Sequence, residues 1–339
     1  MIPGTSNSKK PEPADWRRLW RDAVTDPLEL LDLLGLTDLA ADLADAGLAA
    51  FPLRVPRGYV AKMRRGDRHD PLLRQVLPLN AEDRPVPGFN LDAVGDAAAK
   101  AGDGVLHKYQ GRALLIATGS CAIHCRYCFR RHFPYADETA AKDHWRPALS
   151  YLRDRTDIDE VLLSGGDPLS LSNAKLASLY EALAELPSIR RIRIHTRLPI
   201  VLPERIDSGL LQLFRNSPKT QVMVIHANHA QELDAPVGQA LSDLRQAGVQ
   251  LLNQSVLLRG VNDRLESLSE LSERLIELGV LPYYLHLLDR VAGTAHFEVD
   301  ATEAAALERG LRNSLPGYLV PKFVREIAGE PAKTPAFQP

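Results

Sequence analysis

Short apolar runs alternate with amphipathic stretches along the chain from residue 112 onward. The runs have the length of β-strands and lie at 112–118, 160–166, 191–197, 221–228, 249–258 and 282–289. Between them, apolar residues recur every three to four positions, which is the spacing of one face of a helix. Strands that alternate with such helices indicate βαβ units and a parallel sheet.

Six βα units are fewer than the eight that close a complete barrel. The pattern therefore predicts an α/β fold, namely an open and partial (β/α)6 barrel of the TIM type. Barrels of this kind bind their ligands at the carboxyl ends of the strands. We therefore expect the loop that follows the first strand, at 119–131, to line the functional site.

The chain before the first barrel strand has a different pattern. Helical spacing of apolar residues predicts helices between residues 14 and 55, whereas the stretch from 56 to 105 is rich in Pro, Arg and Asp. The predicted parts are a flexible arm at 1–13, a helical and irregular region at 14–105, the barrel at 106–300 and a C-terminal segment at 301–339. The N-terminal helices either shield the barrel or make subunit contacts in a homo-oligomer.

Composition narrows the class of protein. The chain has 339 residues, of which 45% are apolar and 25% charged, and its net charge is −2, as in ordinary soluble globular proteins. This balance gives no electrostatic reason to expect nucleic acid or a membrane as partner. The N-terminus has no apolar run typical of a secretory signal, and three cysteines do not make a disulfide framework. We therefore expect a cytoplasmic protein.

All three cysteines lie within eight positions of the loop after the first barrel strand. Cys121, Cys125 and Cys128 have the spacing C-x3-C-x2-C. A structural zinc site would need a fourth ligand, which His124 or His132 could supply. Buried free thiols are a second alternative. A four-iron cluster held by three cysteines is the third, and it would leave one iron open to a small molecule.

This spacing, with Tyr127 just before the last cysteine, resembles the radical S-adenosylmethionine superfamily. The resemblance implies a [4Fe-4S] cluster on the three cysteines, with S-adenosylmethionine bound to the open iron. It also implies that His226 and Gln254, on the fourth and fifth barrel strands, lie near S-adenosylmethionine. Both could instead be core residues whose polar atoms are satisfied within the protein.

The second barrel strand ends in the sequence LLSGGDPL. Its two glycines allow a close approach of the backbone and are expected to leave amides free to bond a ligand. The segment resembles the glycine-rich segment that holds the methionine amino group in the same superfamily. The residues that carry this likeness are Ser164, Gly165, Gly166 and Asp167. A tight turn in which Asp167 caps a helix is the alternative.

Five motifs in the same order narrow the resemblance further. CRYCFRR, SGGDPL, NQSVLLRGVND, PYYLHLLD and AGEPAKTP together resemble the lysine 2,3-aminomutase family, over roughly residues 50 to 337. The match is closest to a short branch that serves the modification of elongation factor P. It implies conversion of L-lysine to (R)-β-lysine, a separate ligase that attaches the product, and an electron donor such as flavodoxin or ferredoxin.

The family also uses pyridoxal 5′-phosphate, and the resemblance implies which residues bind it. Lys333 would carry the cofactor covalently, whereas Lys322 lies outside the Gly/Pro turn that matches the family. Arg112 matches a phosphate contact, and Lys108 stands where the fermentative enzymes carry arginine. Lysine keeps the charge but loses the forked geometry of arginine. Alternatively, Lys108 and Arg112 are ordinary cations on the protein surface.

The implied substrate contacts lie at both ends of a lysine molecule. Arg130 would bind the carboxylate through two parallel hydrogen bonds. Arg131 beside it has the same side chain, so only the alignment with the family's motif assigns this role to Arg130. Asp289 would bind the distal ammonium. The second family position for this ammonium is an aspartate, and here it is Glu326, one methylene longer. An exposed carboxylate on the protein surface is the alternative for both acidic residues.

Two rival functions follow from the same residues. The first is the same chemistry on another amino acid such as glutamate, although two acidic side chains favour a cationic substrate. The second is a non-catalytic, metal-binding scaffold that contacts elongation factor P or its ligase. Zinc in a colourless protein would favour the scaffold, and a brown, oxygen-sensitive protein would favour the enzyme.

Overall fold

A ten-stranded sheet forms the centre of the molecule. The structure is a computed structural model, and it describes residues 15–135, 140 and 145–337. The strands are neighbours in chain order: β1 Lys100–Gly102, β2 Val105–Tyr109, β3 Arg112–Thr118, β4 Glu160–Gly165, β5 Arg191–Thr196, β6 Thr220–Ile225, β7 Gln250–Val256, β8 Leu281–His286, β9 Lys322–Arg325 and β10 Thr334–Pro335. From β3 to β9 they run parallel, while β1, β2 and β10 pair antiparallel at the two edges.

The six predicted barrel strands are β3 to β8, so the predicted open α/β barrel is confirmed. The sheet continues beyond them on both sides. Strand β9 pairs in parallel with β8 and was not predicted, because its four residues follow Pro321 and carry no apolar run. The sheet therefore crosses the boundaries expected at 105 and at 300.

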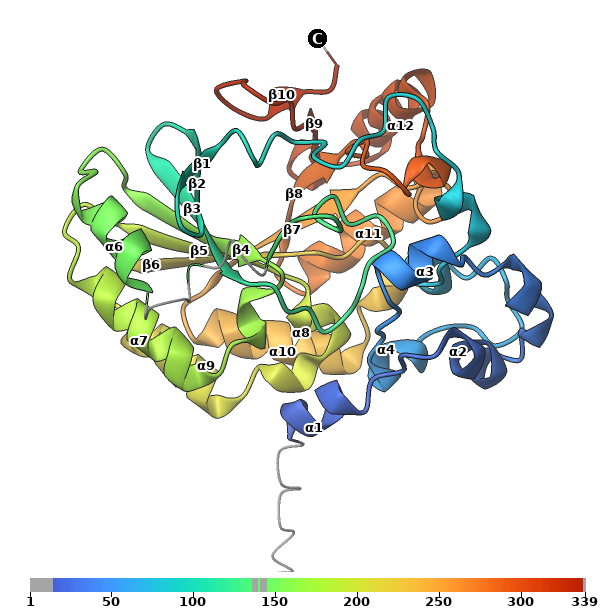
Figure 1. The fold of residues 1–339 in the computed structure, drawn as a ribbon, viewed down its shortest axis with the longest axis horizontal. Helices are drawn as coiled ribbons and strands as arrows, with labels where there is room; N and C mark the ends of the chain where they lie inside the picture. The colour runs from blue at the N-terminus through green and yellow to red at the C-terminus, as the bar shows by residue number, and fades with distance from the viewer. Residues whose placement is uncertain (1–14, 136–139, 141–144, 338–339) are drawn as a thin grey trace, which may run out of the picture.

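Helices cover the outer face of the curved sheet (Figure 1). They connect the parallel strands and are α6 Arg146–Arg153, α7 Asn173–Ala184, α8 Leu198–Val201, α9 Ser208–Asn216, α10 Ala235–Gln246, α11 Leu265–Glu277 and α12 Ala301–Ser314. Helix α10 shows why the sequence folds in this way. The side chain of Asp234 caps its N-terminus by accepting a hydrogen bond from the amide of Val237. Its buried residues Val237, Leu241 and Leu244 recur at helical spacing.

The N-terminal region consists of short helices. They are α1 Trp16–Arg21, α2 Pro27–Leu34, α3 Ala46–Ala50, α4 Arg57–Val60 and α5 Pro71–Arg74. Helix α2 begins with Asp26 as the capping residue and Pro27 in its first turn, and it ends at Gly35, whose φ is +68°. The helical spacing expected between residues 14 and 55 is interrupted at Leu43, which adopts an extended backbone. The expected flexible arm at 1–13 lies outside the described residues.

A single apolar core joins the N-terminal region to the barrel. Leu30 and Leu72 of the short helices belong to the same buried cluster as Leu163 and Leu176 of the barrel. The N-terminal helices therefore pack against the barrel along this shared core. Within the described part of the chain, no helix combines the length and the apolar character needed to cross a membrane.

Candidate active site

A cavity of about 410 Å³ opens at the carboxyl ends of the barrel strands. Every residue predicted for the site lines it: Lys108, Arg112, Cys121, Cys125, Cys128, Arg130, Ser164, Gly165, Gly166, Asp167, His226, Gln254, Asp289, Glu326 and Lys333. These residues come from positions more than 200 residues apart in the chain. The fold thus gathers them in one place, and their individual roles stay predictions.

The three cysteines lie on the loop after β3. Burial raises the pKa of Cys121, and it raises that of Cys128 to about 11. The sulfur of Cys125 accepts a hydrogen bond from the guanidinium of Arg197 at 2.7 Å. The buried thiols of Cys121 and Cys128 stay protonated until a metal cation draws them into the thiolate form. The donor set and its enclosed position therefore fit a metal cluster.

The two histidines that could complete a zinc site are engaged elsewhere. Nδ1 of His124 lies 2.7 Å from the carbonyl oxygen of Pro52, and its ring stacks on Phe51. His132 is exposed, and its Nε2 lies 3.2 Å from the carbonyl of Ala292. Neither histidine lines the cavity. This geometry disfavours the zinc alternative.

The glycine-rich segment at the end of β4 packs against the cysteine loop. A Cβ on Gly165, whose φ is +112°, would lie 2.7 Å from the carbonyl oxygen of Thr118, and one on Gly166 would lie 2.5 Å from that of Ser120. The amides of Gly166 and Asp167 donate hydrogen bonds to these same two carbonyls, at 2.7 and 2.8 Å. The prediction that these amides are free is therefore wrong, because closing the turn consumes them.

The carboxylate of Asp167 is also committed within the protein. It accepts hydrogen bonds from the Thr196 hydroxyl at 2.6 Å and from the Arg197 amide at 2.7 Å. It also caps the short helix after β4 through the amide of Leu169. Burial raises the pKa of Asp167, and these hydrogen bonds oppose the rise. The capping alternative for this residue is confirmed, and it fixes β4 against β5.

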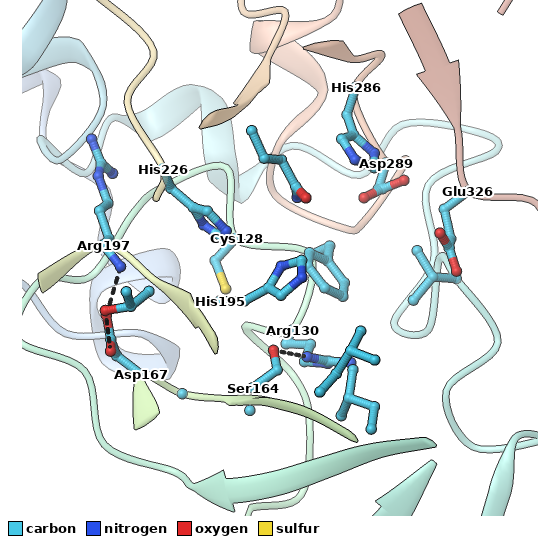
Figure 2. Close-up of a pocket in the computed structure, with 18 of the residues that line it drawn as sticks. Cys128, Arg130, Ser164, Asp167, His195, Arg197, His226, His286, Asp289 and Glu326 are labelled. Atoms are coloured by element: carbon cyan, nitrogen blue, oxygen red, sulfur yellow. Dashed lines mark hydrogen bonds between the residues drawn. The ribbon is translucent and has the colours of Figure 1, made fainter. Parts of the chain in front are cut away.

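Three imidazoles reach into the cavity from neighbouring strands. His195 and His286 lie on β5 and β8, and His226 directly follows β6; Figure 2 shows their rings around one space beside Cys128. Burial lowers the pKa of all three, to about 4 for His226. Their Nε2 atoms, and Oε1 of Gln254, have no hydrogen-bond partner in the part of the chain that the structure describes. Unsatisfied buried polar atoms of this kind fit a polar ligand.

The tail lysine lies opposite an acidic group. Nζ of Lys333 is 2.7 Å from Oε2 of Glu326, and it lies 5.8 Å from the centre of the Tyr284 ring. Glu326 also accepts a hydrogen bond from the hydroxyl of Tyr109 at 2.6 Å. Burial favours the neutral acid, but Lys333 and Tyr109 outweigh it and lower the pKa of Glu326. The glutamate is therefore charged and already placed to hold an ammonium group.

The two predicted phosphate contacts differ in their surroundings. The guanidinium of Arg112 stacks on the ring of Tyr109 at 4.5 Å. The ammonium of Lys108 contacts Asp96 and donates to the carbonyl of Val94, both at 2.7 Å. Both cations line the cavity, so neither is an ordinary surface charge.

A buried arginine forms a hub beneath the cysteine loop. Arg197 directly follows β5, and its guanidinium contacts Cys125 and Tyr127 at 2.7 Å, Gln75 at 2.6 Å and Glu232 at 2.9 Å. Burial alone would raise the pKa of Glu232, but the positive charge of Arg197 outweighs it and lowers this pKa. An unpaired charge at this position would cost about 3–5 kcal/mol. The fold therefore requires the ion pair between Arg197 and Glu232.

Sequence reasoning missed four residues of this site: Asp96, His195, Arg197 and His286. A usable signal existed for three of them. His195 and His286 are polar residues inside apolar strands, and Arg197 directly follows such a strand. Asp96 stands in an irregular stretch, and nothing in its local sequence marks it.

The open parallel barrel, with a three-cysteine loop after its first parallel strand and unsatisfied polar groups around the cavity, agrees with the resemblance of the sequence to the radical S-adenosylmethionine class. No family model matches the chain. It is 48% identical over 328 residues to the L-lysine 2,3-aminomutase of Escherichia coli, covering 96% of this chain and 95% of that one. It is 43% identical over 323 residues to that of Haemophilus influenzae, covering 95% and 96%. The chain therefore belongs to the lysine 2,3-aminomutase family.

Solved structures give a partial overlap. The structure described as anSMEcpe with bound AdoMet superimposes on 59% of this chain and 58% of its own, with a TM-score of 0.45 and 10% identity. The family assignment rests on the sequence relatives.

Proposed function

We propose that this enzyme converts L-lysine into (R)-β-lysine by moving the amino group from C2 to C3. The observation that carries the proposal is the charge pattern of the cavity, because Figure 2 shows Arg130 on one side of it and Asp289 and Glu326 on another. Lysine carries a carboxylate and a distal ammonium, which match these two walls. The contact between Glu326 and the Lys333 ammonium supports it, because the distal ammonium of lysine is the same chemical group.

The cofactors of the proposal are a [4Fe-4S] cluster on Cys121, Cys125 and Cys128, S-adenosylmethionine, and pyridoxal phosphate on Lys333. When bound, they supply the radical that removes a hydrogen atom and the carbonyl that carries the migrating amino group. His226 and Gln254, whose polar atoms lack partners among the described residues, would bind S-adenosylmethionine together with the segment 164–167.

The protein's own residues hold the substrate and exclude water. Lys108 and Arg112 offer positive charge to a phosphate group. The guanidinium of Arg130 would bind the carboxylate, while Asp289 and Glu326 hold the far end of the molecule. Held at both ends, the substrate is fixed along its length, which positions its C2 and C3 atoms for reaction. A substrate with a distal carboxylate, such as glutamate, would be repelled by the two acids.

We further propose that the product serves the modification of elongation factor P in the cytoplasm, through a separate ligase. Flavodoxin or ferredoxin would supply the electron. The resemblance of this chain's motifs to those of the short family branch supports this placement.

Anaerobic turnover tests the proposed function. Protein reconstituted with iron and sulfide would receive dithionite, S-adenosylmethionine, pyridoxal phosphate and L-lysine, and chiral chromatography would identify the products. We expect (R)-β-lysine from L-lysine and no β-amino acid from L-glutamate. Cleavage of S-adenosylmethionine without any β-lysine would overturn the assignment of lysine as substrate.

Lysine binding should depend on pH through Asp289. Burial raises the pKa of this carboxyl from its ordinary value of 3.8 to about 7, with Lys333 opposing and Glu326 adding to the rise. Only the ionised form attracts an ammonium, so affinity should increase about tenfold between about pH 6 and pH 8. Calorimetry on wild type and Asp289→Asn would show it, since the variant should lose this part of the dependence. An unchanged profile in the variant would contradict the role.

The same carboxyl affects stability in the opposite direction. The folded protein keeps a proton that the unfolded chain releases between about pH 4 and pH 7. Over that range the contribution of Asp289 to stability therefore falls as pH rises, and above it the contribution stays constant.

A further inference from the structure

A short segment of the N-terminal region crosses the open side of the barrel. This segment, residues 90–96, is called the strap. Its amide at Asn90 donates to the carbonyl of Arg290 at 3.1 Å, and the amide of Ala292 donates to the carbonyl of Asn90 at 2.8 Å. At its other end, a Cβ on Gly95 would lie 2.7 Å from Cβ of Ala328. The strap thus connects the loop after β8 with the C-terminal tail (Figure 1).

The last residue of the strap, Asp96, is buried between two cations of the cavity. It is 2% exposed. Its Oδ2 accepts a hydrogen bond from Nε of Arg130 at 2.6 Å, and its Oδ1 lies 2.7 Å from Nζ of Lys108. Its backbone amide is held in turn by the side chain of Asp92 at 2.9 Å. Burial alone would raise the pKa of Asp96, but the two cations outweigh it and lower this pKa. The carboxylate is therefore charged.

Asp96 also completes a series of alternating charges along the cavity wall. From Lys108 the series continues to Glu326, whose Oε1 is 3.5 Å away, and from Glu326 to Lys333 at 2.7 Å. Arg130 stands at the other end of the series. The strap therefore links the wall proposed for the substrate carboxylate with the wall that holds the tail lysine.

The two anchors of Arg130 determine which of its hydrogen-bond donors remain for a ligand. Nε donates to Asp96, and Nη1 donates to the hydroxyl of Ser164 at 3.1 Å. These bonds lie on two sides of the planar guanidinium, so together they fix its plane. A guanidinium that is already oriented loses less freedom when it binds a carboxylate.

We propose that Asp96 is a positioning residue, which orients Arg130 from the strap so that Arg130 receives the carboxylate of the substrate. The inference rests on the proposed function, since it assigns Arg130 to that carboxylate. Asp96 itself does not touch the substrate. It acts through the side chain of Arg130.

Calorimetry with two ligands tests the inference. The cluster- and pyridoxal phosphate-loaded protein would be titrated with L-lysine and with L-lysinamide, which keeps both amines but lacks the carboxylate. Asp96→Ala should weaken the binding of L-lysine at least about tenfold and change that of L-lysinamide less than about twofold. Asp96→Asn, which keeps an acceptor for Nε without the charge, should show a smaller loss for L-lysine.

A second background shows whether Asp96 acts through Arg130. In an Arg130→Lys protein the forked donor is gone, so adding Asp96→Ala should cost little further L-lysine affinity. Asp159→Ala is the matched control, because Asp159 pairs with Arg191 at 2.6 Å outside the cavity, and it should bind both ligands as wild type does.

Each contrary result has a distinct meaning. Equal weakening of both ligands by Asp96→Ala, or an equal loss in the two backgrounds, would overturn the inference and leave Asp96 a structural residue. Unchanged L-lysine binding in both Asp96 variants would also overturn it. If the wild-type protein bound neither ligand, the proposed function itself would fail.

Discussion

Replacing Lys333 by alanine should abolish amino migration and leave the iron content unchanged. Lys333 lies in the cavity with its ammonium 2.7 Å from Glu326, where a carbonyl cofactor can reach it. The proposed chemistry needs a lysine that binds the cofactor covalently, so we expect turnover to fall by at least about 10⁴-fold. Chiral chromatography of the products would measure the loss, and the visible absorbance of bound pyridoxal phosphate would disappear with it.

Lys322 provides the matched control for this experiment. It is the other lysine of the C-terminal segment, and it stands exposed on β9, outside the cavity. Lys322→Ala should keep both the cofactor absorbance and turnover. Residual β-lysine formation by Lys333→Ala, or loss of the cofactor in Lys322→Ala, would move the covalent site to another residue.

Replacing Cys125 by alanine should remove the cluster and all activity. Three cysteine ligands would already leave one iron of a four-iron cluster without a protein donor, and losing one of the three would leave a second iron unheld and release the cluster. We expect iron to fall to about background and turnover to become undetectable. Iron analysis and the brown absorbance of the reconstituted protein would measure it.

The histidines of the loop separate the cluster from a zinc site. His124→Ala and His132→Ala should both keep their iron, because each ring is engaged with a backbone carbonyl away from the cavity. Loss of metal in either variant, with zinc rather than iron in the wild type, would refute the cluster and favour the non-catalytic scaffold.

The sequence was sufficient to predict the barrel because its strands carry short apolar runs. In a parallel sheet covered by helices, strands such as β3 and β4 contain consecutive apolar residues, so they stand out from the amphipathic helices between them. Strand β9 could not be predicted, since its four residues become a strand only by pairing with β8. Short strands of this kind are set by tertiary contacts.

The site was predicted as far as its residues carry a local pattern. The cysteine spacing and the tail around Lys333 are such patterns. Asp96 is not, because its role comes from two cations that reach it across the fold, 12 and 34 residues away in the chain. The amides after Gly165 were predicted wrongly for a related reason. A glycine turn shows where the backbone can approach something, but it does not show whether a ligand or another loop is approached.

The Arg197 hub has a consequence for how the cysteine loop is held in place. Its guanidinium binds Gln75 across 122 positions of the chain and Tyr59 across 138. The side chain that donates a hydrogen bond to Cys125 is therefore fixed in part by the N-terminal region. A chain without that region would keep its three thiols but lose two of the contacts that hold Arg197 beside Cys125.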